Sequence, residues 1–108
     1  MDVRRIAMWS GPRNLSTAMM RSFETRPDCS VVDEPLYAAY LAATGLDHPG
    51  RDDVLASQPT DPDVVLARLT DDLVATPLQY QKHMTHHLLD GVERRPLGTL
   101  VHAFLVRD

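Results

Sequence analysis

The sequence predicts an α/β fold in which a parallel sheet of about four strands is flanked by helices. Short apolar runs alternate along the chain with helix-compatible segments, and this order is typical of parallel strands joined by crossover helices. The chain is 44% hydrophobic and 24% charged, which is ordinary for a globular protein. We therefore expect a single domain over residues 1–108.

The spacing of apolar and turn-forming residues places each expected element. Strands are expected at about residues 4–9, 29–33, 78–83 and 99–106, and helices at about 15–25, 35–44, 62–74 and 84–92. In the first helix, residues at helical spacing predict the face that packs on the sheet: Leu15, Ala18, Met19, Ser22 and Phe23. Residues 45–62 are polar and rich in turn formers, so we expect an exposed connection that could act as a mobile lid.

The last expected strand closes at the end of the sequence. A helix usually follows each strand of a buried parallel sheet, so we expect the fold to be incomplete at its C-terminus. The chain would then be the truncated N-terminal portion of a longer domain. A second copy of the chain, in a homo-oligomer, could complete it.

Residues 4–22 have the pattern of an anion-binding strand–loop–helix. An apolar run meets Gly11-Pro12, a strong breaker, and a helix-compatible stretch follows. Ser16 and Thr17 lie in the first turn of the expected helix, just after Arg13. A helix N-terminus offers unpaired N–H groups and a positive dipole end, to which two hydroxyls and a guanidinium would add hydrogen bonds to a phosphate or sulfate.

This loop departs from the Mg-ATP phosphate loop, G-x-x-x-x-G-K-[ST]. Counted from Gly11, Ser16 stands at the second Gly, Thr17 at the Lys and Ala18 at the hydroxyl position. The sequence therefore does not match a Mg-ATP site at these three positions. The simpler alternative is a strand-to-helix turn in which Ser16 or Thr17 only caps the helix.

Two further segments place polar residues at strand ends. Arg107 closes the apolar run from Leu100 to Val106, although a solvated strand end is the simpler alternative. His83 follows Lys82 at the end of another expected strand, and an ordinary histidine pKa near 6.5 suits proton transfer. His83 and His87 are spaced like the histidines of H-E-x-x-H, but the Glu and a third ligand are missing, so no metal is expected.

The loop resembles the 5′-phosphosulfate loop of P-loop sulfotransferases, commonly G-x-P-[RK]-S-G-[ST]-T-x-[LM]. The chain has Asn14-Leu15 where that family usually has Ser-Gly. The resemblance implies a P-loop nucleotide-binding-like fold and transfer of a sulfuryl group from 3′-phosphoadenosine 5′-phosphosulfate (PAPS) to an acceptor hydroxyl or amine. It places Arg13 against the bridging and sulfuryl oxygens. It also implies that the nucleotide is bound by Gly11, Pro12, Arg13, Asn14, Ser16 and Thr17.

The resemblance extends to the other strand ends. Arg107 matches the family's 3′-phosphate-binding arginine, at the end of a strand followed by Asp. Gln81 to Met84 resembles the K-x-H-[LM] pattern, which implies that His83 is the general base and Lys82 an electrostatic partner. Asp33-Glu34-Pro35 resembles a segment on the acceptor side, where one carboxylate would orient the acceptor; the alternative is two solvated charges before a helix.

The sequence thus predicts a PAPS-dependent sulfotransferase, or its N-terminal fragment, which needs no metal and acts on a small-molecule acceptor. The alternatives are a kinase-like P-loop phosphotransferase and a non-catalytic fragment that binds an anion or a partner. The net charge of −4 and the pI of about 5.6 argue against nucleic-acid and anionic-membrane binding. The single cysteine fits a reducing cytoplasm, and no apolar run is typical of a membrane span or signal peptide.

Overall fold

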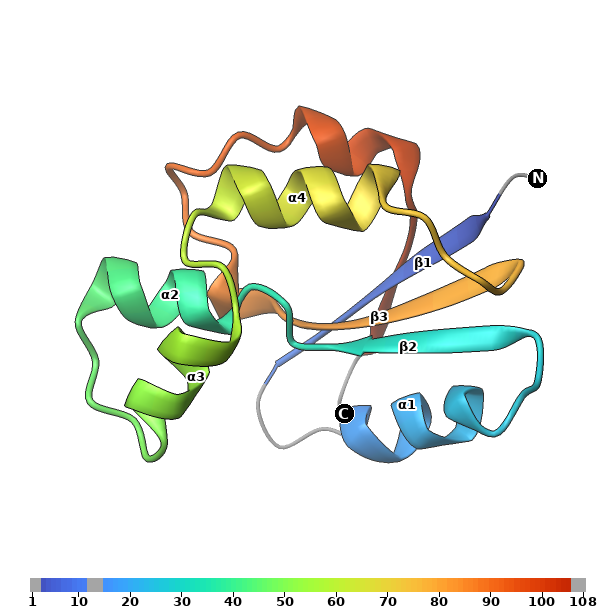
Figure 1. Ribbon diagram of the computed structural model, residues 1–108, viewed down its shortest axis with the longest axis horizontal. Coiled ribbons are helices and arrows are strands. Elements are labelled where there is room, and N and C mark those ends of the chain that lie inside the picture. The colour runs from blue at the N-terminus through green and yellow to red at the C-terminus, as the bar shows by residue number, and fades with distance from the viewer. Residues whose placement is uncertain (1–2, 12–14, 106–108) are drawn as a thin grey trace.

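The computed structural model describes residues 3–11 and 15–105 and contains a four-stranded parallel sheet (Figure 1). The strands lie in the order β2-β3-β1-β4. Their bounds are β1 Arg4–Ser10, β2 Cys29–Asp33, β3 Leu78–Met84 and β4 Val101–Leu105. The predicted fold class, a parallel sheet of about four strands flanked by helices, is confirmed.

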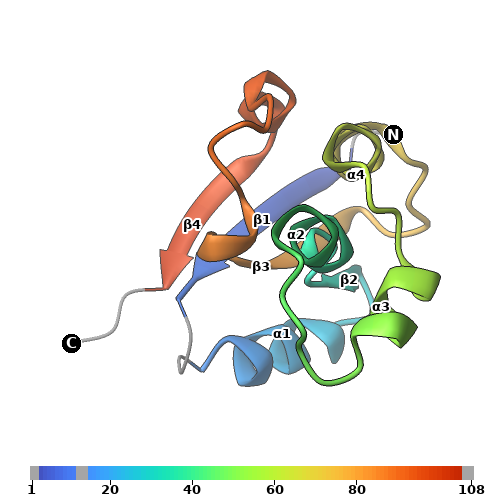
Figure 2. The same ribbon diagram turned by 90° about the vertical axis from the view of Figure 1, so that its left-hand side faces the viewer.

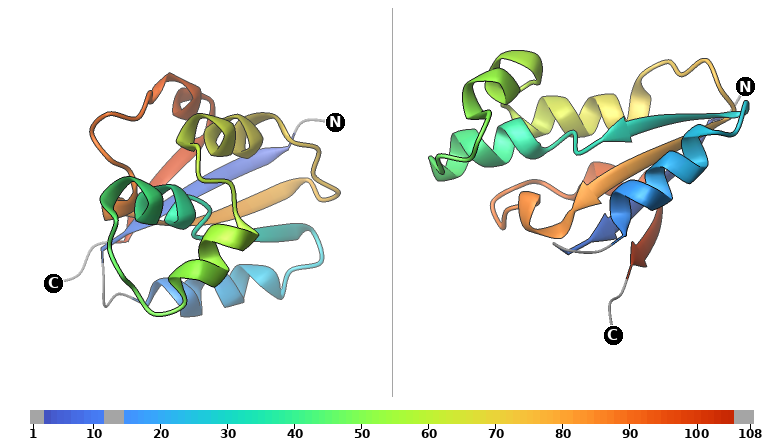
Figure 3. Two further views of the ribbon diagram at one scale, coloured as in Figure 1. Left: turned by 60° about the vertical axis from the view of Figure 1, so that its left-hand side comes forward. Right: turned by 90° about the horizontal axis from the view of Figure 1, so that it is seen from below.

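Helices cover both faces of this sheet (Figures 2 and 3). After β1, helix α1 runs along one face; α4 and the 3₁₀-helix η2 lie over the other (Figure 2). The helices are α1 Ser16–Glu24, α2 Tyr37–Thr44, α3 Arg51–Ser57 and α4 Pro62–Asp71, with 3₁₀ turns η1 Thr85–His87 and η2 Arg95–Thr99. Among the described residues, no helix is long and apolar enough to cross a membrane.

The core consists of two apolar layers, one on each side of the sheet. Because side chains alternate along a strand, Tyr80 of β3 points to the α1 side, where Phe23 stacks on it with ring centroids 4.4 Å apart. On the other side, Trp9 of β1 is buried among leucines of α4 and η2. Each such side chain contributes roughly 1.5–3 kcal/mol when it leaves water.

Two buried polar side chains, Gln79 and Gln81, lie on the α4 face of β3, and Gln81 is fully buried. Gln81 Nε2 donates to the Leu69 carbonyl at 3.0 Å and to Gln79 Oε1 at 2.9 Å. Partnered amides of this kind are tolerated inside a core. Sequence patterning alone did not indicate that these polar residues would be buried.

Three expected elements differ in the structure. The connection over 45–62 contains helix α3, which starts after Gly50 in the left-handed conformation, with φ 76°. The helix expected at 84–92 is only the single 3₁₀ turn η1. The helix expected over 62–74 ends at Asp71. The polar composition of residues 45–62 did not indicate α3, because a short solvated helix needs no apolar stripe.

The face of α1 that packs on the sheet is also rotated from the expected one. Leu15 is the N-cap residue and is 78% exposed, and Ala18 and Ser22 are exposed as well. Met20, which the expected stripe omitted, is completely buried. The side chains directed inward belong to Ser16, Met19, Met20 and Phe23.

Candidate functional site

The carboxyl ends of β1, β2 and β3 meet at one edge of the sheet. In the strand register, Ser10 of β1 lies beside Met84 of β3, and Asp33 of β2 lies beside Lys82. The chain leaves β1 at this edge and enters α1 (Figure 1). Ligands of open parallel sheets bind outside this edge, so side chains gathered here are the first candidates for a site.

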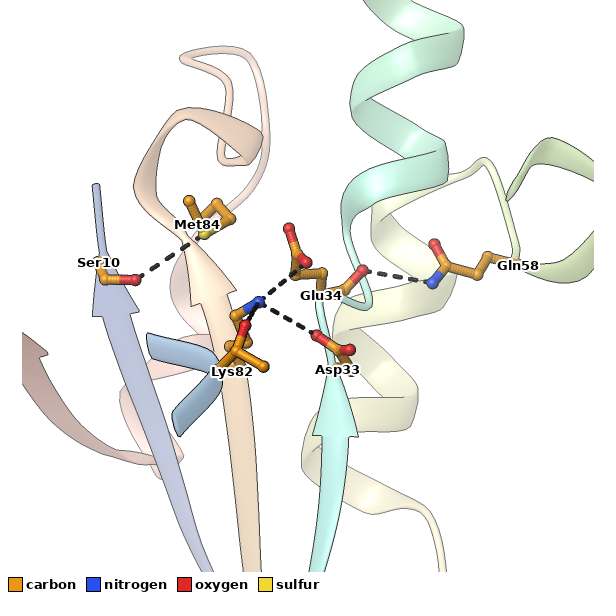
Figure 4. A network of polar contacts seen from close by, with 7 residues as sticks. Ser10, Asp33, Glu34, Gln58, Lys82 and Met84 are labelled. Carbon is orange, nitrogen blue, oxygen red and sulfur yellow. Dashed lines mark hydrogen bonds and ion pairs between the residues drawn. The ribbon is translucent and has the colours of Figure 1, made fainter. Parts of the chain in front are cut away.

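Lys82 is the centre of a polar network at this edge (Figure 4). Its Nζ donates to Glu34 Oε2 at 3.0 Å and to Thr17 Oγ1 at 3.1 Å, and it lies 3.5 Å from Asp33 Oδ1. Only 7% of the Lys82 side chain is exposed, against 29% for Glu34 and 51% for Asp33. One ammonium therefore joins the first turn of α1 to the end of β2.

Glu34 has a left-handed backbone with φ 48°, the only non-glycine residue with positive φ among residues 3–11 and 15–105. This conformation is costly for a side chain with a Cβ. Its N–H donates to the Lys82 carbonyl at 2.9 Å. Its own carbonyl accepts from the Tyr37 N–H at 3.2 Å and from Gln58 Nε2 at 3.3 Å. The backbone bonds thus hold the carboxylate beside the ammonium.

The first turn of α1 is a second component of the edge. Leu15 is the N-cap residue of α1 and makes no side-chain capping bond. Neither Ser16 nor Thr17 is therefore the N-cap residue that the simpler alternative expected. Ser16 is buried and Thr17 is exposed. The N–H groups of a first turn have no partner inside their helix, and no acidic residue lies in this turn, so the turn suits an anion.

Several expected donor-binding residues lie outside the described part of the chain: Pro12, Arg13, Asn14 and Arg107. Gly11 is described and follows the end of β1. A Cβ at Gly11 would meet no atom within 4 Å, so the described protein itself leaves open space there. Of the expected donor-binding residues, Gly11, Ser16 and Thr17 lie in the described part of the chain.

His83 lies on the opposite side of the sheet from Lys82, because consecutive strand residues point to opposite faces. The ring is 1% exposed and stacks on Trp9, with centroids 4.4 Å apart. Its Nε2 lies 3.0 Å from Gln81 Oε1. An amide oxygen only accepts, so this contact requires the hydrogen on Nε2 and leaves Nδ1 as the unprotonated atom.

The environment of His83 disfavours its charged form. Burial, followed by the nearby His102 and His87 rings, lowers its pKa to about 3. Within the described part of the chain, the buried His83 Nδ1 has no hydrogen-bond partner. A base of such low pKa has little driving force to take a proton at neutral pH. The placement therefore weighs against the role of general base that the pattern predicted.

A cluster of aromatic rings and imidazoles joins η1 to α2. His87 stacks on Tyr37 with centroids 4.9 Å apart, and Tyr40 lies 5.0 Å from the same ring. Burial and the neighbouring His86 lower the pKa of His87 to about 4. Within residues 3–11 and 15–105, no group of three or more His, Cys, Asp or Glu could hold a metal ion.

One residue of the network, Gln58, had no signal in the sequence. It lies at the end of α3, inside the segment expected to be an exposed connection. Its amide reaches across to Glu34 (Figure 4). Only the fold brings it there, because the two residues are 24 positions apart and no local motif links them.

Fold and site together define an α/β domain with a strand–loop–helix and a buried lysine at the carboxyl edge of its sheet. The family model described as "Sulfotransferase domain" matches residues 4–108. The chain belongs to this sulfotransferase domain family.

Two curated relatives come from Arabidopsis thaliana. The chain is 39% identical over 103 residues to "Branched-chain-amino-acid aminotransferase-like protein 1" and 36% identical over 103 residues to "Branched-chain-amino-acid aminotransferase-like protein 2". Each alignment covers 95% of this chain but only 19% and 18% of the relatives. The chain therefore spans about a fifth of the length of the relatives it matches. No solved structure matches the chain significantly.

Proposed function

We propose that this chain provides the donor-binding part of a PAPS-dependent sulfotransferase that acts on a small-molecule hydroxyl or amine. The observation that carries the proposal is the Lys82 ammonium, held 3.1 Å from Thr17 Oγ1 at the start of α1. A cation, a hydroxyl and a helix N-terminus together favour a phosphate or sulfate at this edge. The family supplies the sulfuryl chemistry.

In this proposal, the loop from Gly11 to Thr17 binds the 5′-phosphosulfate and Arg107 binds the 3′-phosphate. The acceptor oxygen or nitrogen forms a bond to sulfur while the bond from sulfur to the bridging phosphate oxygen breaks. 3′-Phosphoadenosine 5′-phosphate leaves with the bonding electron pair. Arg13 and Lys82 stabilise the negative charge that grows on the bridging oxygen, by electrostatic preorganisation.

The acceptor must also lose a proton. The sequence pattern predicted His83 for this step, but Glu34 is the better proposal because its carboxylate shares the Lys82 face of the sheet. His83 lies on the other face, stacked on Trp9. Glu34 is released from Lys82 when the donor's oxygens accept from the ammonium, and its free carboxylate then takes the acceptor's proton.

Nucleotide binding tests the donor. A thermal-shift titration compares 3′-phosphoadenosine 5′-phosphate with 5′-AMP and with Mg-ATP, since a ligand that binds only the native state raises Tm. We expect the 3′-phosphorylated nucleotide to give the largest shift. The Arg107→Ala variant should bind 3′-phosphoadenosine 5′-phosphate and 5′-AMP equally. In the wild type, equal Tm shifts with 3′-phosphoadenosine 5′-phosphate and with 5′-AMP would refute the 3′-phosphate site. A Tm shift with Mg-ATP alone would favour a kinase-like transferase.

Turnover tests the catalytic roles once an acceptor is found. Arg13→Ala should lower kcat by roughly a hundredfold, as loss of one charge-stabilising donor does elsewhere. A variant with unchanged affinity and turnover would remove Arg13 from the mechanism. Glu34→Gln should lower kcat more than His83→Gln does, and the reverse order would restore His83 as the base.

A further inference from the structure

Gln58 connects two backbone positions that flank the turn between β2 and α2. Its Oε1 accepts from the Ala38 N–H at 3.1 Å, and its Nε2 donates to the Glu34 carbonyl at 3.3 Å. Figure 4 shows the amide extending from the end of α3 toward Glu34. Both ends of the amide are used, so its orientation is determined by its two partners.

The contact at Ala38 compensates for a missing cap. Ala38 lies in the first turn of α2, where N–H groups have no partner inside the helix. The N-cap residue Leu36 makes no side-chain capping bond. Gln58 therefore acts as an N-cap supplied from a distant segment, and this anchors its amide beside the turn.

The contact at Glu34 supports a costly backbone. At φ 48°, a residue with a Cβ is less stable than in its right-handed conformation. The Gln58 donor and the Tyr37 N–H both bind the Glu34 carbonyl, and these bonds offset the strain. The same backbone orients the Glu34 carboxylate 3.0 Å from Lys82 Nζ.

We infer that Gln58 is a positioning residue that holds Glu34 on Lys82, so that the Glu34 carboxylate competes with an incoming phosphate or sulfate for the ammonium. This inference rests on the proposed function, because it assumes that an anion binds beside Thr17. The competition has a defined consequence. Donor binding displaces Glu34, and the strained turn supported by Gln58 keeps the freed carboxylate at the edge of the sheet.

The sign of the effect follows from the charges. Removing the carboxylate in Glu34→Gln takes one negative charge away from the anion's surroundings and leaves Lys82 with fewer competing acceptors. Its pair with Lys82 is partly exposed, and a pair worth about 1 kcal/mol corresponds to about fivefold in affinity. Gln58→Met frees Glu34 from its held position and should act in the same direction.

A double-mutant cycle tests the inference with 3′-phosphoadenosine 5′-phosphate as the probe, its affinity measured by calorimetry. We expect Glu34→Gln and Gln58→Met each to tighten binding, by about fivefold and about threefold. In the Glu34→Gln background, Gln58→Met should add nothing, because its effect passes through that carboxylate. Ser57→Ala is the matched control on the same helix, and it should bind as the wild type does. A variant with a damaged fold would bind the nucleotide more weakly. Tighter binding by Gln58→Met therefore distinguishes positioning of Glu34 from a purely structural role of Gln58.

Equal affinities of the wild type and Gln58→Met, or additive effects in the cycle, would overturn the inference while leaving the proposed function intact. Absence of binding to the wild type would overturn the proposed function, and the inference with it. If Gln58→Met does not unfold cooperatively, Gln58→Glu replaces it, since its carboxylate still accepts from Ala38 but has no N–H for Glu34. Its added charge is matched by Ser57→Glu, and tighter binding to Gln58→Glu than to that control is the expected result; equal or weaker binding would overturn the inference.

Discussion

Replacing Lys82 by methionine removes the ammonium while keeping a side chain of similar length. Breaking a fully buried ion pair costs about 3–5 kcal/mol, and an exposed pair is worth about 0–1 kcal/mol. The Lys82 side chain is only 7% exposed, but Glu34 and Asp33 are 29% and 51% exposed and can regain water. We therefore expect Lys82→Met to lower the free energy of unfolding by about 2 kcal/mol.

Urea unfolding measures this loss, which corresponds to roughly 10 °C in Tm for a chain of this size. Part of the loss comes from carboxylates left without a cation. Adding Glu34→Gln to Lys82→Met should therefore restore about 0.5–1 kcal/mol. The variant should also bind 3′-phosphoadenosine 5′-phosphate about tenfold more weakly. Wild-type stability in Lys82→Met, or a further loss in the double variant, would refute the reasoning.

Three other predictions concern stability and are measured by urea unfolding. Glu34→Gly should be about 1 kcal/mol more stable than Glu34→Ala, because glycine tolerates positive φ; equal stabilities would contradict the strain. The pKa values of His83 and His87 are lowered to about 3 and about 4, so the unfolded chain binds more protons below pH 6.5. Stability should fall from pH 6.5 toward pH 4 by up to about 1.4 kcal/mol per pH unit for each ring, and His83→Leu should roughly halve this slope. Trp9→Phe removes the indole N–H that donates to His102 Nδ1 at 2.9 Å and should cost about 1 kcal/mol, whereas no loss would show that water replaces the donor.

The sequence predicted the sheet well because strand-forming segments alternate with helix-compatible segments along the chain, a pattern that needs no distant information. It could not show that Lys82 and His83 have different surroundings, although their side chains had to point to opposite faces. Which face carries α1 depends on the crossover from β1 to β2. That choice brings Lys82 to Thr17 and leaves His83 under Trp9.

Other parts of the site could not be predicted because they depend on tertiary contacts. The helix α3 is only seven residues long and lies in a segment rich in polar and turn-forming residues, so this segment resembled a loop. The amide of Gln58 reaches Glu34 only after α3 has packed beside α2. The positive φ of Glu34 carries no local signal, because a Glu before Pro35 is usually extended.

The strand order β2-β3-β1-β4 also determines when the sheet can form during protein synthesis. Strand β1 makes no ladder with β2; its partners are β3 and β4, and Arg4 pairs with Leu78 of β3. At about 5–20 residues per second, the ribosome needs roughly 4–15 s to make the chain between them. Throughout that interval, the apolar run around Ala7 and Trp9 has both strand edges unpaired, and it is then a segment that a chaperone could bind.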